Sequence, residues 1–311
     1  MTATILTHGD HDGMVCAIML LRRYPEAALR FSNDRNLARD LHAVAATEPP
    51  PAELLIADIA LGPRQHDAMR EAVRAVAVRG TAIRLFDHHT GWRSHSDLPE
   101  LFATFCVDDQ RTTAAVLVRR ECLPDDGEAG FWLSVLSRKG ASPETAMHFA
   151  LLAALQNREN YGINTDILRA LARDRTMRPE WAALAEAHRA REARALAEAL
   201  AVAETLTTTQ GRRVGWLDRR ASRDRIFVDE QVMRAHGWDL VANATARKVT
   251  LGGAHIDSGV SLRALHGAHD VAGVRLQVVG HDSPVAITPL GRGGSTDSFL
   301  RAVRKLIVER L

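Results

Sequence analysis

The sequence predicts an α/β protein with a parallel-sheet N-terminal domain, a helical linker and a smaller α+β C-terminal domain. Three observations lead to this prediction. Short apolar runs alternate with helical patterns in the first half of the chain, an Ala-, Glu- and Arg-rich stretch of high helix propensity follows, and strand-like segments dominate the second half. With 311 residues, the chain is long enough for two domains.

Three apolar runs in the first half have the length and composition of buried strands. They lie at residues 4–7, 54–57 and 82–86, and helical patterns follow them at residues 14–23, 63–78 and 112–120. Strands that alternate with helices are typical of a parallel sheet covered on both faces. Such sheets bind ligands outside the carboxyl ends of their strands. We therefore expect an N-terminal domain over residues 1–178.

The linker is expected over residues 179–210. Its apolar side chains form a partial stripe, which favours one long surface helix that joins two domains; they are Trp181, Leu184, Leu196, Leu200 and Leu206. A C-terminal domain is expected over residues 211–311. Its predicted elements are strands at 213–217, 240–245 and 260–265, a hairpin turn at Gly252–Gly253, and an amphipathic helix at 299–311.

Composition excludes several classes of protein. The 40 basic and 38 acidic residues leave a net charge of +2, so we expect no surface that binds long duplex DNA. The three cysteines, Cys16, Cys106 and Cys122, form neither a zinc module nor a disulfide framework, which favours a reducing cytoplasm. No secretory signal pattern opens the sequence, and no apolar run approaches the ~20 residues of a membrane span. We expect a cytoplasmic protein with no membrane partner.

Side chains of the types that bind metals follow each predicted strand of the first half. They are His8, Asp10 and Asp12 after the first strand, Asp58 after the second, and Asp87, His88 and His89 after the third. In an extended chain, residues two apart project to the same side, so His8, Asp10 and Asp12 can converge. If the strands are parallel neighbours, all three clusters meet at one edge of the sheet.

The chemistry of these clusters indicates a metal centre. Carboxylates brought together repel one another unless cations neutralise them. Carboxylates mixed with imidazoles suit manganese, iron or zinc better than calcium. Two such ions, about 3.5–4 Å apart, can activate water and bind the oxygens of a phosphate ester. Each cluster alone has a structural explanation, such as a strand-end cap for Asp58, but three strand ends in order favour a metal-dependent phosphoesterase.

At these residues the sequence resembles the DHH phosphoesterase family, which is named for the triplet Asp87-His88-His89. The segment from Thr7 to Gly13 is similar to the family's first motif, and Asp58 matches its second. Within the family, the spacing His-x-Asp-x-Asp-Gly is shared with the nano-RNase B-like oligoribonucleases. The resemblance covers nearly the whole chain in order, and it is more specific in the first half than in the second.

The resemblance implies two divalent metal ions, with Mn²⁺ as the expected metal. One ion would be held by His8, Asp10 and Asp58, and the other by Asp12, Asp58 and His88. His89 would act as a hydrogen-bond donor or general acid, and it is grouped with Asp87 as the predicted catalytic pair. The family's fourth motif is best matched by Glu159, a further expected ligand. Its alternative is a surface glutamate paired with Arg158 or another arginine.

In the second half, Gly259 to Arg263 looks like the core strand of the DHH-associated substrate domain. Gly280 to Ser283 looks like a reduced form of its glycine-rich, histidine-containing loop. The resemblance implies that Arg263, His281 and Gly280 bind the substrate. The family's loop has two or three glycines before its histidine, whereas this loop has one, and Asp282 adds a negative charge.

The expected function is a phosphodiesterase or phosphoesterase that hydrolyses short oligonucleotides or dinucleotides through a dinuclear metal centre. Two alternatives stay open. One is a pyrophosphate, polyphosphate or nucleoside-bisphosphate phosphatase, and the other is a catalytically silent nucleotide-binding module. Aromatic side chains that stack on bases would favour nucleotides, and Trp92 and Tyr161 are candidates. The pattern does not decide whether the chain forms a homodimer.

Overall fold

A computed structural model describes most of the chain. The described residues are 2–61, 65–94, 97–108, 112–137, 142–156, 163–220, 226, 228, 230–253, 262–280, 285–290 and 295–311. The chain divides into two compact units, Met1–His188 and Arg189–Leu311. The division falls inside the segment that the sequence marks as a linker.

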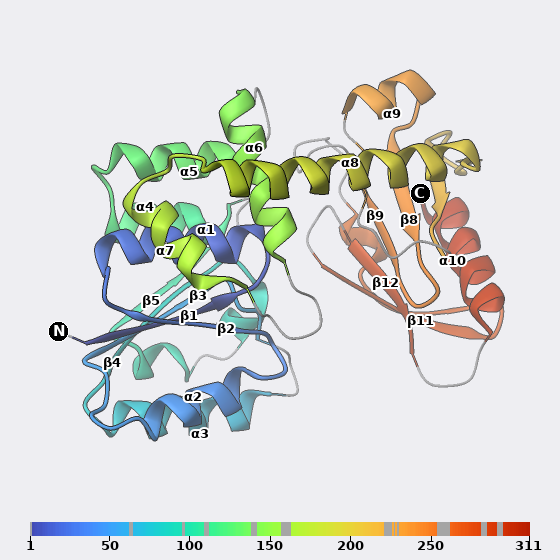
Figure 1. The fold of residues 1–311 in the computed structure, drawn as a ribbon. Helices are drawn as coiled ribbons and strands as arrows, with labels where there is room; N and C mark the ends of the chain where they lie inside the picture. The colour runs from blue at the N-terminus through green and yellow to red at the C-terminus, as the bar shows by residue number, and fades with distance from the viewer. Residues whose placement is uncertain are drawn as a thin grey trace. The chain divides into compact units, whose positions relative to one another are not determined.

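A five-stranded sheet forms the centre of the N-terminal unit (Figure 1). Its strands, in spatial order, are β2 (Ala28–Ser32), β1 (Ala3–His8), β3 (Glu53–Ala57), β4 (Ala82–Asp87) and β5 (Thr104–Val107). All neighbouring strands are parallel, which confirms the predicted sheet. The direction in which strands are added reverses between β1 and β3. The carboxyl ends of these two strands therefore border the position where such sheets bind ligands.

Helices cover both faces of this sheet (Figure 1). On β3, Leu54 and Ile56 pack with α2 and α3, whereas Leu55 packs with α1 and the later helices, because successive side chains alternate. All three side chains are fully buried. The helices of this unit are α1 (His11–Arg23), α2 (Leu37–Ala45), α3 (His66–Ala77), α4 (Ala114–Cys122), α5 (Gly127–Ser137), α6 (Pro143–Leu155) and α7 (Thr165–Arg173), with short 3₁₀ turns η1 (Thr90–Ser94) and η2 (Pro99–Leu101).

The long helix α8 (Pro179–Ala201) contributes to both cores. Trp181 packs in the N-terminal unit, and Leu200 packs in the C-terminal unit. The prediction that the helix extends to Leu206 was wrong, because Leu206 lies in β6 (Glu204–Thr207) and pairs with Val214. Threonines dominate this segment, and β-branched side chains favour strands. Among the described residues no helix, α8 included, is long and apolar enough to cross a membrane.

A seven-stranded mixed sheet forms the C-terminal unit, in the order β10-β11-β12-β9-β8-β7-β6. Only its β7–β8 pair is parallel among the described pairings. The amphipathic helix α10 (Thr296–Arg310) packs on one face through Phe299, Val303 and Ile307. The remaining elements are β7 (Arg213–Asp218), α9 (Glu230–His236), β8 (Leu240–Ala244), β9 (Val249–Gly252), η3 (Arg263–Leu265), β10 (Gly267–Val271), β11 (Val274–Gly280) and β12 (Val285–Pro289).

Two local predictions in this unit were wrong. The strand expected up to Leu265 is, in its described part, the 3₁₀ turn η3, closed by a 3.0 Å bond from the Leu265 N–H to the Leu262 carbonyl. These two buried leucines are three residues apart, a spacing that places both on one side of a 3₁₀ turn. The hairpin turn lies not at Gly252, which ends β9, but between β8 and β9, where the Thr245 N–H bonds to the Lys248 carbonyl at 2.9 Å.

Candidate metal centre

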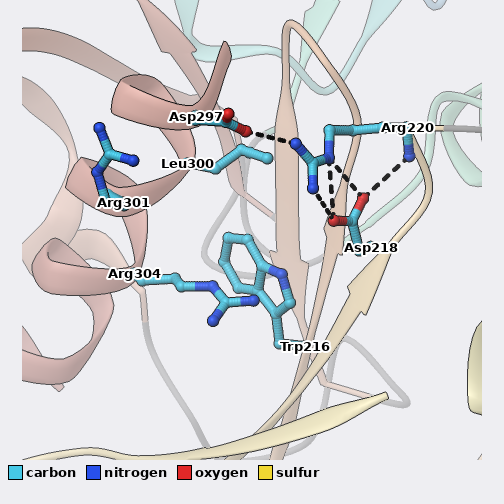
Figure 2. A pocket seen from close by; sticks show the side chains of 7 residues that line it. All are labelled: Trp216, Asp218, Arg220, Asp297, Leu300, Arg301 and Arg304. Carbon is cyan, nitrogen blue, oxygen red and sulfur yellow. Dashed lines mark hydrogen bonds and ion pairs between the residues drawn. The ribbon is translucent and has the colours of Figure 1, made fainter. Parts of the chain in front are cut away.

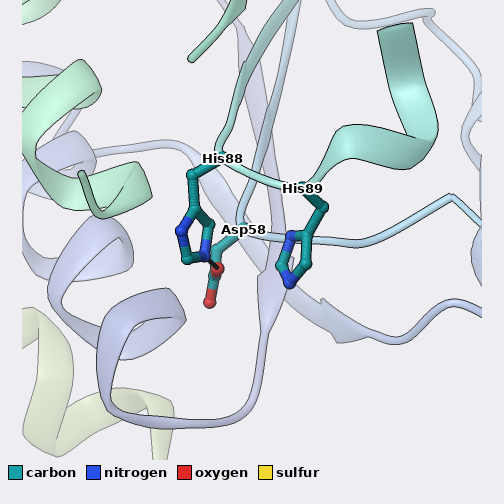
Figure 3. Close-up of side chains that lie close together, drawn as sticks. All are labelled: Asp58, His88 and His89. Carbon is teal, nitrogen blue, oxygen red and sulfur yellow. Dashed lines mark ion pairs between the residues drawn. The ribbon is translucent and has the colours of Figure 1, made fainter. Parts of the chain in front are cut away.

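The carboxyl ends of β1, β3 and β4 bring the expected metal ligands together. Thr7 pairs with Ala57, and Ala57 pairs with Phe86, so the residues that follow these positions lie side by side. Two groups of potential metal ligands occur here, and within each group the ligand atoms lie within 4.8 Å of one another. One group is His8, Asp10 and Asp58, and the other is Asp58, His88 and His89 (Figure 3). Asp58 belongs to both groups.

The first motif turns into a helix directly after β1. Asp10 is the N-cap of α1 and accepts a 3.1 Å bond from the Gly13 N–H, and its Oδ2 lies 3.1 Å from Nδ1 of His8. A Cβ atom at Gly13 would lie 2.2 Å from the His8 carbonyl oxygen, so only glycine allows the helix to start this close to the strand. The expectation that Asp12 lies in an extended segment was therefore wrong, because Asp12 belongs to the first turn of α1.

Asp12 points at the start of α4. Its two carboxylate oxygens accept the backbone N–H groups of Ala114 (2.8 Å) and Ala115 (3.0 Å). The N-cap residue of α4, Thr113, makes no capping bond with its own side chain, so Asp12 takes over that role. Asp12 Oδ2 also lies 3.7 Å from Nε2 of His88. Each carboxylate oxygen can accept more than one partner, so these bonds leave Asp12 able to bind a metal.

Asp58 is 3% exposed and has a left-handed backbone, with φ of +58°. Aspartate is one of the few non-glycine residues found in this region, at a cost of about 1–2 kcal/mol. Its Oδ1 lies 3.2 Å from Nε2 of His88. Within the described part of the chain, its buried Oδ2 has no hydrogen-bond partner. A buried charged oxygen without a donor destabilises the fold, and a bound cation would compensate for it.

His88 is oriented by its Nδ1, which donates a 2.9 Å hydrogen bond to the Thr112 carbonyl. Because that carbonyl can only accept, Nδ1 carries the proton, and Nε2 faces Asp58 with its lone pair available. Metal-ligating histidines typically have such an outer partner. Burial, followed by the charge of His89, lowers the pKa of His88, which favours the neutral form that binds metals.

His89 is held by Asp87. One Asp87 oxygen accepts both Nδ1–H (2.7 Å) and the backbone N–H (2.6 Å) of His89. Although burial lowers the pKa of His89, the hydrogen bond to Asp87 outweighs it, and the pKa is raised. Asp87 itself is fully buried, so it can position His89 but cannot touch a substrate. The two predicted catalytic residues therefore have different environments.

Crowded negative charge shifts the carboxyl groups in different directions. Burial and then the charge of Asp10 raise the pKa of Asp12 to about 7. The same two causes raise the pKa of Asp58 well above its usual range. Burial also raises the pKa of Asp10, but the hydrogen bond and charge of His8 outweigh it, so that this pKa is lowered. The cluster is short of positive charge, as expected for a site that holds cations.

The other predicted site residues are described only in part. Arg263 lies in η3, and Gly280 ends β11. The side chain of Arg263 is not among those that the structure describes. Glu159, Tyr161 and His281 lie outside the described residues.

The prediction that Trp92 could stack on a base was wrong. It is fully buried in the core, and its indole N–H donates to the Ile59 carbonyl at 2.8 Å. Thr112 and His11 had no predicted role. No side-chain pattern could have identified Thr112, because it contributes a backbone carbonyl to a histidine 24 positions away.

The C-terminal unit contains a pocket of about 180 Å³ between β7 and α10 (Figure 2). Most of its charged side chains form ion pairs with one another or with a neighbour, whereas Arg301 donates to the Ser298 hydroxyl. Arg220 bonds to Asp218 and Asp297, and Arg304 bonds to Glu204 through two nitrogens at 2.8 and 2.9 Å. This pocket lies in a different unit from the metal-ligand cluster.

No family model and no curated protein matches the sequence. Solved structures do match. A DHH-domain member of the s1p family of ribosomal proteins has a TM-score of 0.57 at 11% identity, over 99% of this chain and 87% of that chain. The pGpG-specific phosphodiesterase PggH from Vibrio cholerae has a TM-score of 0.53 at 12% identity, over 99% of both chains. RecJ from Thermus thermophilus, in complex with Mn²⁺, has a TM-score of 0.50 at 13% identity, over 98% of this chain and 52% of that chain.

At such low identity these likenesses concern the fold. The parallel sheet with its helical cover, followed by a mixed-sheet unit, is the architecture that the chain shares with them. The protein therefore has the fold of the solved DHH-domain structures.

Proposed function

We propose that this protein is a metal-dependent phosphoesterase of the DHH superfamily that hydrolyses short oligonucleotides or dinucleotides. The observation that carries the proposal is the convergence of histidines and aspartates at the carboxyl ends of β1, β3 and β4: His8, His88, Asp10, Asp12 and Asp58. A buried Asp58 oxygen without a donor in the described residues and the raised pKa of Asp58 both indicate missing positive charge.

The donor set fits divalent transition metals, with Mn²⁺ as the first choice. We assign one ion to His8, Asp10 and Asp58, and a second to Asp12, Asp58 and His88, with Glu159 as a candidate further ligand. Bound divalent ions would supply Lewis acidity toward phosphoryl oxygens and would lower the pKa of water. The protein's part is to hold its carboxylates in place and to keep the ligand nitrogen of His88 unprotonated.

His89 is proposed to donate a proton to the leaving oxygen of the ester. Its ring lies beside Asp58 and His88 (Figure 3). Because Asp87 accepts a hydrogen bond from Nδ1 and the pKa of His89 is raised, the protonated form that a general acid needs is favoured. From the C-terminal unit, Arg263, Gly280 and His281 are proposed to bind the terminal phosphate or nucleotide of the substrate.

Two observations support a small nucleotide substrate. The net charge of +2 suits a short substrate better than long duplex DNA. The fold is shared with a phosphodiesterase that is specific for pGpG. One observation favours the second candidate, a pyrophosphate, polyphosphate or nucleoside-bisphosphate phosphatase, because burial of Trp92 removes a side chain that was expected to stack on a base. The third candidate is a catalytically silent nucleotide-binding module.

A hydrolysis panel with Mn²⁺ distinguishes these candidates. It comprises pGpG, short RNA and DNA oligonucleotides, cyclic dinucleotides, a nucleoside bisphosphate, pyrophosphate and polyphosphate, with metal content measured by elemental analysis. Metal-dependent turnover of dinucleotides or oligonucleotides supports the proposal. Turnover of pyrophosphate or polyphosphate alone supports the second candidate, and bound metal without turnover supports the silent module. A protein that binds no divalent metal contradicts the proposed metal centre.

A further inference from the structure

His11 connects the first metal-ligand motif to α6. Its imidazole stacks on the ring of Phe149, with centroids 3.9 Å apart and planes inclined by 12°. The side-chain amide of Gln156, the C-cap residue of α6, donates to Nδ1 of His11 at 2.7 Å. This hydrogen bond joins residues 145 positions apart. One side chain at the start of α1 is therefore held by two contacts from a single distant helix.

The position of His11 gives these contacts their importance. It is the first residue of α1 and lies between Asp10 and Asp12. Asp10 caps this helix at Gly13, and Asp12 reaches from its first turn to the start of α4. The orientation of one helical turn therefore sets the direction of both carboxylates, and a rotation of that turn would move both relative to Asp58.

Charge repulsion acts against this arrangement. The three carboxylates Asp10, Asp12 and Asp58 lie close together: beside burial, the charge of Asp10 raises the pKa of Asp12, and the charges of Asp10 and Asp12 raise the pKa of Asp58. On one side, the turn abuts the end of β1, where even a Cβ atom at Gly13 would lie 2.2 Å from the His8 carbonyl oxygen. On the side of α6, the contacts of His11 hold the turn.

Helix α6 is a firm support for these contacts. Leu151 and Leu152 are fully buried in the core of the unit. The ring nitrogens of His148 lie 2.8 Å from the Glu144 carbonyl oxygen, within α6, and 2.7 Å from the Arg175 carbonyl oxygen, and the second contact joins α6 to the segment before α8. Phe149 and Gln156 therefore belong to an element that is fixed independently of the metal cluster.

We propose that His11 is a positioning residue for the metal centre: through Phe149 and Gln156 it fixes the first turn of α1, so that Asp10 and Asp12 face the same ions as Asp58. This inference rests on the proposed metal-dependent function. Residues that orient metal ligands typically change metal affinity by about ten- to hundredfold when they are replaced. We expect an effect of that size, with kcat at saturating Mn²⁺ close to the wild-type value.

Mn²⁺ titration of the metal-free full-length protein, by calorimetry or electron paramagnetic resonance, tests the inference. His11→Ala removes both contacts and should weaken Mn²⁺ binding by about ten- to hundredfold. His11→Phe keeps the stack and loses the hydrogen bond, and Gln156→Ala loses the same bond from the other side. Both should weaken binding less than His11→Ala, and to similar extents. The matched control is His42→Ala, which changes an exposed histidine on α2 and should leave binding unchanged.

Two further measurements separate positioning from a merely structural role. Thermal unfolding of the metal-free variants should stay close to that of the wild type, and activity at limiting Mn²⁺ should recover when Mn²⁺ is raised. If His11→Ala does not fold, His11→Phe and Gln156→Ala still decide the matter. Wild-type Mn²⁺ affinity in these variants would overturn the inference while the proposed function stands. A wild-type protein that binds no Mn²⁺ would overturn both.

Discussion

The two units handle negative charge in opposite ways. In the N-terminal unit, Asp12 lies in the first turn of α1 and Asp58 follows the end of β3, and burial and neighbouring carboxylates raise both of their pKa values. In the C-terminal unit, the carboxylates are matched by guanidinium groups: Arg220 bonds to Asp218, and Arg304 bonds to Glu204. These arginines lower the pKa values of the two carboxyl groups.

This difference teaches that charge balance is a better guide to chemistry here than the size of a pocket. In the C-terminal pocket between β7 and α10, most charged side chains are ion-paired, and the Arg304–Glu204 pair fastens α10 to β6. The N-terminal cluster retains an unfavourable excess of negative charge. Such an excess is typical of cation-binding sites, because a bound cation removes the repulsion between the carboxylates.

The largest expected effect is at Asp58, the residue shared by both proposed ions. Asp58→Asn should abolish turnover and metal loading together, because it removes the proposed bridging charge. Asparagine tolerates the left-handed backbone at this position, so the fold should persist. Thermal unfolding of the metal-free variant should shift upward, because a repelled carboxylate is gone. Elemental analysis and calorimetry check both effects, and normal metal occupancy with normal activity would contradict the dinuclear assignment.

The next effect concerns proton transfer. His89→Gln should lower kcat by about 10²- to 10⁴-fold, the usual contribution of a general acid, and it should leave Mn²⁺ affinity unchanged. Asp87→Asn should lower kcat as well, because an amide oxygen replaces the charge that stabilises protonated His89. Steady-state kinetics on the best panel substrate, beside Mn²⁺ titration, provide the measurement. A loss of metal binding in His89→Gln would instead make His89 a ligand.

The pH dependence of stability should have opposite signs for Asp12 and for the paired carboxylates of the C-terminal unit. Asp12 has a folded pKa of about 7, against about 3.9 in an unfolded chain. The metal-free folded state therefore binds more protons, and its stability should fall as pH rises from about 4 to 7. Asp218 and Glu204 have lowered pKa values, so their contribution should be present above their ordinary range and lost on acidification.

Unfolding of metal-free protein between about pH 3 and pH 8 tests these signs. Asp58→Asn, which removes one repelling carboxylate, should flatten the decline toward neutral pH. Asp218→Asn should leave that decline in place and change only the acid side. Identical pH profiles of stability in the wild type and in Asp58→Asn would show that repulsion between the carboxylates does not destabilise the metal-free fold.

The smallest expected effect is on the C-terminal pairs. Asp218→Asn should destabilise the protein by about 0.5 kcal/mol, since partly exposed ion pairs contribute about 0.2–1 kcal/mol. Metal content and turnover should not change, because the pocket is not part of the proposed catalytic centre. Urea unfolding and the substrate panel together check this. A loss of activity without loss of stability would indicate that the pocket binds something after all.

Local pattern predicted the interior of the first sheet well and its edges poorly. Strands β1, β3 and β4 are nearly continuous apolar runs because both of their faces are covered. The edge strands β2 and β5 were not anticipated. β5 has only four residues, all partly exposed, and in β2 the exposed Arg30 interrupts the apolar run, so neither strand shows the continuous apolar run of a central strand.

By itself, the sequence determined which residue types stand at the three strand ends, since these positions are set by the apolar runs that precede them. Only the tertiary structure decided what each side chain does there. Asp12 meets the N–H groups of α4, His88 meets the Thr112 carbonyl, and His11 meets Gln156. Most of these partners are backbone atoms, and all come from distant segments. A hydrogen bond to a main-chain group leaves no side-chain signature, so packing of the helices against the sheet was needed to assign them.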